Sequence, residues 1–263
     1  MTKITRLIEF KNKKGNVLRG VLVSTKNPSK RGVIFLHGFE RVSTTEKKFT
    51  RLANELIKWK IVSFRFDYTG CGLSDGDFRY TTVKSMRDDF DKALISFKEA
   101  VNLEDVVVVV HSVSACVVAI SKWFDKFSKI ILLAPALNQK GLSRYWYVKS
   151  KNPEEKINWK NYKNFLDERG FEKYCEIKNR MTKTNYILNN YFLENKNKDY
   201  SLFFKKYKSK VLHIHGDKDE KVPLNSLNVD FPHKIIVRNG DHDLERPDMM
   251  KQWIKRCVNF IKK

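Results

Sequence analysis

The chain has 263 residues, 41% of them hydrophobic, and its 52 Lys and Arg against 30 Asp and Glu give a formal net charge of +22 at pH 7. The length and apolar content suit one large α/β core, and no apolar run is long enough for a membrane span or an N-terminal signal, so we expect a cytoplasmic protein. The lysines are spread along the whole chain without arginine-rich clusters, which indicates a solvated basic surface and no specific nucleic-acid site.

Strands and helices alternate along the first half of the chain. Apolar runs on either side of the polar turn "KNKKGN" predict an N-terminal hairpin, and later runs are followed by segments with helical spacing. The predicted strands are 4–10, 17–25, 32–39, 61–68, 106–109 and 129–136, and the predicted helices are 45–60, 82–101 and a segment after Ser114. This order predicts a mostly parallel, twisted sheet with helices on both faces.

The alternation stops at residue 137 and resumes at residue 208. Residues 137–207 are rich in Lys, Asn, Tyr and Phe, helical in places and without strand signals, so we expect a largely helical lid between core segments 1–136 and 208–263. Its aromatic runs "YWYV" and "YILNNYFL" either pack the lid on the core or line an acyl pocket. Strands near 209–215 and 233–238 and a helix at 248–261 complete the expected core.

The run "VVVVVHSVSA" ends a buried strand on a small polar turn that leads directly into a helix. Such a turn lifts a serine clear of the sheet and directs the N–H groups of the following helix at an oxyanion. Ser112 and Ser114 are both candidates for this serine. The usual glycines two positions before and after the nucleophile, which would distinguish the two, are absent around both. The strand length favours Ser112, since a nucleophile at Ser114 would require His111 and Ser112 to extend the strand.

Two later loops supply the partners that a reactive serine needs. A serine hydroxyl becomes nucleophilic when an imidazole removes its proton and a carboxylate orients that imidazole. The strand "VLHIH" is followed by Asp217 and Asp219, and the strand "IIVRN" is followed by His242. The chain order Ser, Asp, His is the order found when these groups follow successive strands of such a sheet.

Five motifs in this order, "FLHGF", "RFDYTGCGLSDGDF", "HSVSA", "HGDKDEKVP" and "GDHDLERP", resemble those of the α/β-hydrolase superfamily. The resemblance is greatest to serine esterases such as bacterial feruloyl and cinnamoyl esterases and to the monoacylglycerol-lipase-like and serine aminopeptidase-like branch. It implies an α/β-hydrolase fold with an inserted lid, and it covers nearly the whole chain outside residues 137–207.

The resemblance also implies roles for individual residues. Ser112 becomes the nucleophile, His242 the base and Asp219 the acid, because the pattern G-x-x-D-x-x-V-P fits Asp219 and leaves Asp217 as a turn residue. The backbone N–H groups of Phe39 and Val113 become the oxyanion hole. The implied activity is cleavage of carboxylic esters of small to medium acyl or aryl-acyl groups, with a small-molecule ester as the partner and no cofactor.

Alternatives to this activity share the same machinery or lack it. A thioesterase or a small-peptide hydrolase would use the same triad, whereas the missing glycines at Val110 and Ser114 would fit a hydrolase-fold binding protein that has lost catalysis. His213 and His215 alternate on a strand, but no acidic motif completes a metal site, so core or turn-anchoring roles are expected. The four scattered cysteines indicate reduced, packed thiols. No oligomeric state is predicted.

Overall fold

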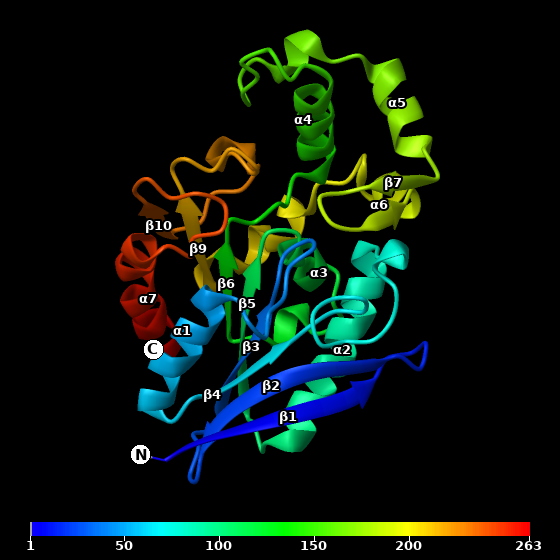
Figure 1. Cartoon of the computed structure of the whole chain (residues 1–263). Coiled ribbons are helices and arrows are strands. Elements are labelled where there is room, and N and C mark those ends of the chain that lie inside the picture. Colours follow the sequence, from blue (N-terminus) through cyan, green and yellow to red (C-terminus); the bar gives the residue numbers. More distant parts are fainter. Residues whose placement is uncertain (1) are drawn as a thin grey trace.

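A computed structural model describes residues 2–263 (Figure 1). Its strands are β1 Lys3–Lys11, β2 Val17–Thr25, β3 Arg31–Leu36, β4 Val62–Phe66, β5 Asp105–His111, β6 Lys129–Leu133, β7 Asn179–Met181, β8 Tyr186–Leu188, β9 Val211–Gly216 and β10 His233–Val237. Its α-helices are α1 Lys47–Leu56, α2 Val83–Ala100, α3 Ser114–Ala119, α4 Gln139–Lys151, α5 Glu168–Glu176, α6 Asn190–Asn195 and α7 Pro247–Lys262. Short 3₁₀ segments lie at 57–59, 78–80, 124–126, 162–165, 200–210 and 224–226.

Eight strands form one sheet in the order β1-β2-β4-β3-β5-β6-β9-β10. β1 and β2 pair antiparallel and β2 joins β4 antiparallel, whereas all pairs from β4 to β10 are parallel. The predicted mostly parallel sheet is therefore confirmed. The carboxyl ends of β3, β5, β9 and β10 lie along one edge of the sheet, and the loops that follow them meet there.

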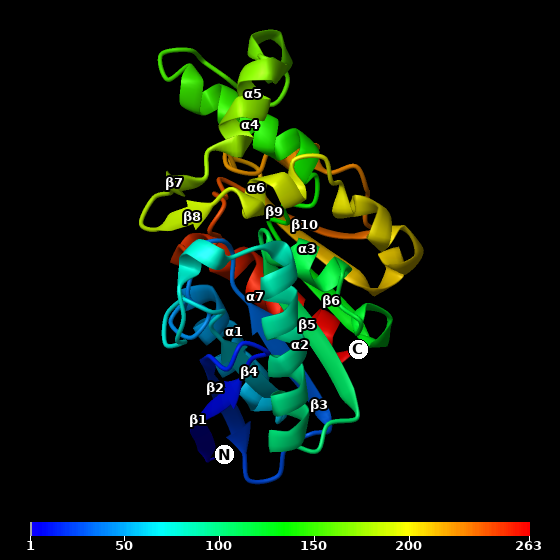
Figure 2. The ribbon, with the colours of Figure 1, turned by 90° about the vertical axis from the view of Figure 1, so that its right-hand side faces the viewer.

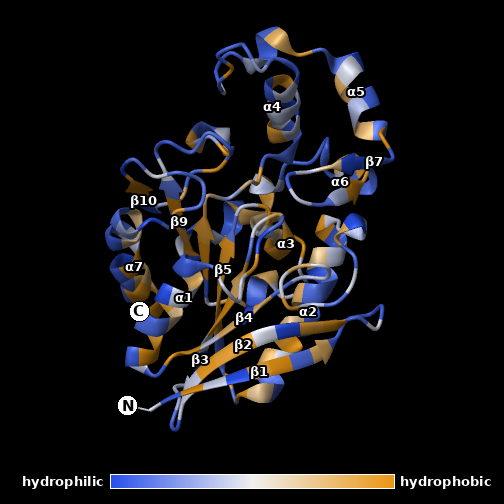
Figure 3. Cartoon of the chain, viewed as in Figure 1, coloured by the Kyte–Doolittle hydropathy of each residue, from blue (hydrophilic) through white to orange (hydrophobic). Residues whose placement is uncertain are grey.

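Helices cover both faces of the sheet, and the alternation of side chains along each strand explains why (Figure 2). In β5, Val107 and Val109 pack with α1 and α7, while Val108 and Val110 pack with α2 and α3. A strand buried on both faces needs apolar residues at every position, which is what the valine run provides. Figure 3 shows the result as a hydrophobic centre beneath helices whose outer faces are polar.

Residues 137–207, here called the cover segment, connect β6 to β9 and lie beyond the carboxyl ends of the parallel strands (Figure 1). The expectation that this segment contains no strands was wrong, because β7 and β8 form a small antiparallel hairpin. Each strand has three residues, too few for an alternating pattern to be visible in the sequence. The hairpin is held by contacts with a distant loop, described below.

Candidate active site

The turn after β5 places Ser112 in a strained backbone conformation. Ser112 has a φ of 56°, in the left-handed region that non-glycine residues seldom occupy. Its amide donates to the Leu133 carbonyl (2.9 Å) and its carbonyl accepts from the amides of Ala115 and Ala136 (both 3.1 Å), so both ends of the turn are anchored. Across the turn, a Cβ on Gly38 would lie 2.9 Å from His111 and 3.2 Å from the Ser112 Cβ, so only glycine allows this close approach.

Ser112, His242 and Asp219 meet above the edge of the sheet. The His242 Nδ1–H donates to Asp219 Oδ2 at 2.8 Å, which leaves Nε2 of the neutral ring to accept from the Ser112 hydroxyl at 3.0 Å. The serine comes from the turn after β5, the aspartate from the loop after β9 and the histidine from the loop after β10. The structure thus brings together three side chains that the sequence places far apart.

Ser114, the alternative nucleophile, lies in a different environment. It is completely buried, and its hydroxyl donates to the His37 carbonyl and contacts the Tyr68 hydroxyl at 2.9 Å. These contacts tie the start of α3 to the loop after β3, at a position where the usual motif has glycine. The missing glycine is therefore compensated by a small side chain that makes hydrogen bonds, and Ser114 does not contact His242.

The Asp219 carboxylate is held in its ionised form by several donors. Oδ1 accepts from the amides of Lys221 (3.0 Å) and Val222 (2.8 Å), and Oδ2 accepts from His242. Burial favours the neutral acid, but hydrogen bonds from His215 and His242 outweigh it and hold the pKa of Asp219 well below its usual range. Asp217, the other candidate in this loop, is exposed.

Two buried histidines of β9, His213 and His215, form a chain of contacts that leads to Asp219. His215 Nε2 donates to the Val222 carbonyl at 2.8 Å and lies 3.3 Å from Asp219 Oδ2. Its Nδ1 therefore accepts, and His213 Nε2–H is the donor at 3.0 Å. The expected turn-anchoring role of this pair agrees with the contacts, but the direct approach of His215 to the acid was not predicted. The i, i+4 spacing of His215 and Asp219 across the strand end was the available signal.

The two backbone N–H groups predicted to form an oxyanion hole lie beside Ser112 without a protein partner in the described chain. Phe39 and Val113 both line the cavity beside Ser112, and neither N–H donates to another residue in the described part of the chain. His37 shapes the loop that carries Phe39, because its Nδ1–H donates to the Gly38 carbonyl (2.8 Å) and its Nε2 accepts from the Tyr68 amide (3.1 Å). Burial lowers the pKa of His37 to about 4, so its ring is neutral at pH 7.

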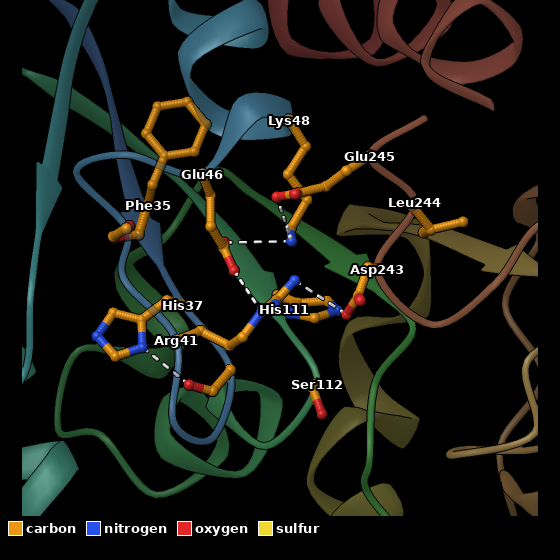
Figure 4. A network of polar contacts seen from close by, with 12 residues as sticks. Phe35, His37, Arg41, Glu46, Lys48, His111, Ser112, Asp243, Leu244 and Glu245 are labelled. Carbon is orange, nitrogen blue, oxygen red and sulfur yellow. Dashed lines mark hydrogen bonds and ion pairs between the residues drawn. The ribbon is translucent and has the colours of Figure 1, made fainter. Parts of the chain in front are cut away.

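A buried charge network connects the loops that carry Phe39 and His242 (Figure 4). The Lys48 ammonium is completely buried and lies 3.2 Å from Glu46 and 3.1 Å from Glu245. Arg41, two residues after Phe39, pairs with Glu46 at 2.9 Å and with Asp243 at 3.0 Å. Because Asp243 adjoins His242, this arginine joins the loop that carries Phe39, here called the oxyanion loop after its predicted role, to the loop that carries His242, here called the histidine loop. No motif in the sequence indicated this network.

His111 fixes the backbone of the histidine loop. Its Nε2–H donates to the His242 carbonyl at 2.8 Å, and the two rings lie 4.8 Å apart between centroids. Burial, and next the nearby Lys48 ammonium, lower the pKa of His111 well below its usual value, so the ring stays neutral. His111 therefore positions His242 without contacting Ser112 as a base.

The cavity above Ser112 has a volume of about 360 Å³ and is bounded by both the sheet edge and the cover segment. This volume is in the range of small-molecule sites. The cover segment contributes mostly apolar and aromatic side chains, and the residues from it that line the cavity are Trp146, Tyr174, Arg180, Met181, Thr182, Tyr191 and Phe192. Both aromatic runs noted in the sequence thus contribute to the cavity wall, "YWYV" through Trp146 and "YILNNYFL" through Tyr191 and Phe192.

Two sets of contacts hold the cover segment over the site. From α4, the Tyr145 hydroxyl donates to the Glu220 carbonyl at 3.1 Å and the Trp146 indole donates to the Lys221 carbonyl at 2.6 Å. At the tip of the β7–β8 hairpin, the Glu40 carboxylate accepts from Thr182 and from the Asn185 amide at 3.0 Å. Glu40 directly follows Phe39, so the hairpin is attached to the oxyanion loop.

Residues 2–263 contain neither a group of metal-ligating side chains nor a membrane-length apolar helix. Across residues 2–263, no three His, Cys, Asp or Glu side chains are grouped so that they could hold a metal ion. None of the helices in that range is long and apolar enough to cross a bilayer. All four cysteines are buried as free thiols.

Comparisons with known proteins place this geometry in a family. The model of a family described as serine aminopeptidase, S33 matches residues 27–176, whereas no curated protein matches the chain. Among solved structures, Est1E from Butyrivibrio proteoclasticus with bound ferulic acid superposes with a TM-score of 0.68 at 18% identity, over 97% of this chain and 96% of that one.

Two further structures share the same fold. The mouse alpha/beta hydrolase domain-containing protein 10 has a TM-score of 0.67 at 17% identity over 98% of both chains. An esterase from Pyrococcus furiosus has a TM-score of 0.65 at 17% identity, over 98% of this chain and 90% of that one. Because the family model spans more than half of the sequence and the fold matches, the chain belongs to the serine aminopeptidase (S33) family of α/β hydrolases.

Proposed function

We propose that this hydrolase cleaves carboxylic esters of small to medium acyl or aryl-acyl groups through a Ser112–His242–Asp219 triad. The observation that carries the proposal is the pair of hydrogen bonds at His242, 3.0 Å to Ser112 and 2.8 Å to Asp219. A decayed hydrolase-fold protein would have no need to keep this alignment or the strained backbone of Ser112.

In the proposed reaction, Ser112 Oγ attacks the ester carbonyl carbon while its proton passes to His242 Nε2. Asp219 stabilises the charged imidazole, and the N–H groups of Phe39 and Val113 stabilise the oxyanion by roughly 3 kcal/mol each. His242 then donates its proton to the leaving alcohol, and an acyl group remains on Ser112. Water, activated by His242, hydrolyses this acyl-enzyme and restores the serine.

Ester cleavage is favoured over aminopeptidase activity by the charges of the cavity. An enzyme that removes N-terminal residues needs a free carboxylate to bind the ammonium group of its substrate. Among the described residues that line the cavity, Asp243 carries the one carboxylate, and Arg41 and Lys221 already face it at 3.0 and 3.8 Å. We also propose that residues 137–207 act as the lid that shapes the substrate pocket, as their position over the cavity supports.

A fluorophosphonate probe tests the function with a matched pair of variants. We expect the probe to label the wild type and Ser114→Ala but not Ser112→Ala, and Ser112→Ala to lose at least about 10⁴-fold in kcat/KM on p-nitrophenyl esters. Ser114→Ala should lose stability by about 1–3 kcal/mol, because buried hydrogen bonds disappear. Labelling that persists in Ser112→Ala and vanishes in Ser114→Ala would assign the nucleophile to Ser114.

No labelling of any protein would favour the non-catalytic binding protein. A comparison of oxygen esters, thioesters and aminoacyl amides with the same acyl group then identifies the bond that is cleaved. A kcat/KM that is highest for a thioester or an aminoacyl amide would replace the ester assignment and leave the triad unchanged.

A further inference from the structure

Arg180 lines the substrate cavity, and its charged group makes no hydrogen bond or ion pair within residues 2–263. It is the central residue of β7, where Asn179 and Met181 are exposed and Arg180 is 9% exposed, so its side chain is directed inward. It lines the same cavity as Ser112 and His242. Its guanidinium carbon lies 3.3 Å from the centroid of the Phe192 ring and 3.8 Å from that of Tyr174.

None of the three guanidinium nitrogens of Arg180 makes a hydrogen bond of good geometry within residues 2–263, although all three are buried, and the nearby Tyr174 hydroxyl offsets only part of the effect of burial on the Arg180 pKa. Arg144, in the same cover segment, provides a comparison. It also lies over an aromatic ring, Phe171 at 4.4 Å, but it pairs with Glu168 at 2.9 Å and donates to the Lys196 carbonyl at 2.7 Å. Of these two arginines, Arg144 therefore has protein partners and Arg180 has none within residues 2–263.

The acidic groups near the cavity are engaged elsewhere. Asp243 faces Arg41 and Lys221, and Glu40 accepts hydrogen bonds from the tip of the hairpin that carries Arg180. Arg180 is thus the positive charge of the cavity lining that the described protein groups leave uncompensated. A single negative charge on a bound molecule would balance it.

An unpaired buried cation is unfavourable in an empty site. Burial removes the water that would solvate the guanidinium, and it lowers the pKa of Arg180 from its usual value. Contacts with the faces of Phe192 and Tyr174 offset part of this cost. They leave the N–H groups, which lie in the plane of the guanidinium, without a hydrogen-bond partner, and a ligand reaches these buried groups when a neighbouring side chain shifts.

We propose that Arg180 binds a carboxylate of the substrate, so that the preferred substrates are esters that carry a free carboxylate beyond an apolar or aromatic spacer. The inference rests on the proposed esterase function of the same cavity. A carboxylate fits because it is planar, carries one charge and accepts two parallel N–H bonds from an arginine. The spacer would lie against the apolar side chains of Tyr191 and Phe192.

Paired substrates that differ only in charge test the proposal. The mono-p-nitrophenyl ester of adipic acid is compared with its methyl ester, and 4-acetoxybenzoate with methyl 4-acetoxybenzoate, so that the carboxylate lies on the acyl or on the alcohol part. In at least one pair, we expect the wild type to favour the free acid by about 10- to 100-fold in kcat/KM. Arg180→Met should abolish that preference, because the rate on the free acid falls much more than the rate on its neutral ester.

Control variants separate recognition from folding. Arg144→Met, which removes an arginine already paired within the protein, should retain the preference for the free acid. Arg180→Lys should keep part of it, because the charge remains and the two-pronged donor is lost. Arg180→Met should melt at the same or a higher temperature than the wild type without ligand, since it removes an uncompensated charge. A lower melting temperature with equal rate losses on both esters would overturn the proposal.

Binding measurements decide the proposal even if no ester is hydrolysed, an outcome that would refute the esterase function alone. Calorimetry with adipate and dimethyl adipate should show binding of the diacid to the wild type and to Ser112→Ala, and its loss in Arg180→Met. Equal binding of adipate to wild type and Arg180→Met would refute the carboxylate site. Preference for a p-nitrophenyl ester that ends in a phosphonate over the carboxylate would assign the site to phosphate groups instead.

Discussion

The sheet edge and the cover segment build the same cavity in different ways. At the sheet edge, the side chains of His242 and Asp219 have protein partners, from His215 to the pair formed by Arg41 and Asp243, and the N–H groups of Phe39 and Val113 are the backbone donors beside Ser112 without one in the described chain. The cover segment contributes aromatic walls and Arg180, which has none in the described chain. Side chains that hydrogen-bond to one another are held in the positions that a reaction needs. A side chain without a protein partner is available to bind a substrate.

This difference predicts two kinds of variant. Changes at the sheet edge should lower kcat or the free energy of unfolding on every substrate, because they disturb contacts within the protein. Changes in the cover segment should alter KM and the ranking of substrates. The four changes below test this division from the largest expected effect to the smallest.

Asp219→Asn should have the largest effect, a loss of about 10³- to 10⁴-fold in kcat on any ester. An amide can donate to His242 and favour the wrong tautomer, and it cannot stabilise the charged ring. The measurement is the steady-state rate on a neutral p-nitrophenyl ester. Asp217→Asn is the matched control two residues away, and a comparable loss there would contradict the assignment of the acid.

The free energy of unfolding should fall as the pH is lowered from 7 to 4. His37, with a pKa of about 4 in the folded chain, takes up a proton near pH 6.5 when unfolded, so the unfolded state binds more protons in this window. The contribution of His37 is about 3 kcal/mol, fully present above pH 6.5 and lost towards pH 4.

Urea unfolding at several pH values measures this slope. His37→Gln should reduce it, whereas His233→Gln, at an exposed position, should leave it unchanged. Equal slopes in the wild type and His37→Gln would show that the ring does not contribute as the sheet-edge contacts imply.

Arg41→Met should lower kcat by about 10- to 100-fold, since the oxyanion loop and the histidine loop lose their common partner and misplacement of reacting groups by about 1 Å has effects of this size. The test compares kcat on neutral and carboxylate esters, which should fall together. Arg79→Met breaks an exposed ion pair with Asp77 and should leave kcat unchanged. A change in KM alone would place Arg41 with the cover segment instead.

Glu40→Gln should have the smallest effect, about a 3- to 10-fold rise in KM with a smaller change in kcat. The Glu40 carboxylate holds the β7–β8 hairpin by accepting hydrogen bonds from its tip. Burial opposes ionisation of the carboxylate, but these hydrogen bonds outweigh it and lower the pKa of Glu40. The measurement is KM for the free acid and its neutral ester, with Glu220→Gln as an exposed acidic control. A fall in kcat without a change in KM would contradict the division.

The sequence predicted the core well because local patterns dictate it. Period-two alternation, valine runs and helical spacing identified nearly every strand of the sheet and the helices around it. The strand ends pointed to Ser112, His242 and the pair Asp217 and Asp219, and the family resemblance selected Asp219 from that pair. The roles of Ser112, Asp219 and His242 remain predictions, although their geometry is now known. The motifs are visible because strand ends carry function in this fold.

The groups that the sequence did not reveal depend on contacts between distant segments. Arg180 lies in a three-residue strand, Glu40 acts on a hairpin more than 140 residues later, and Lys48 is buried although its helical position gives no reason for it. No local pattern distinguishes these residues from the many other charged residues of a strongly basic chain. Only the packing of the cover segment and loops assigns them a place.

Ser112 and His242, the proposed nucleophile and base, lie 130 positions apart in the chain. During synthesis, the elbow after β5 is therefore complete long before β9 and β10 emerge and add to the far side of the sheet. Until those last strands dock, Ser112 lacks the base that the proposed mechanism gives it. In that mechanism, turnover therefore requires the whole sheet to be assembled, and a half-made chain would be chemically silent.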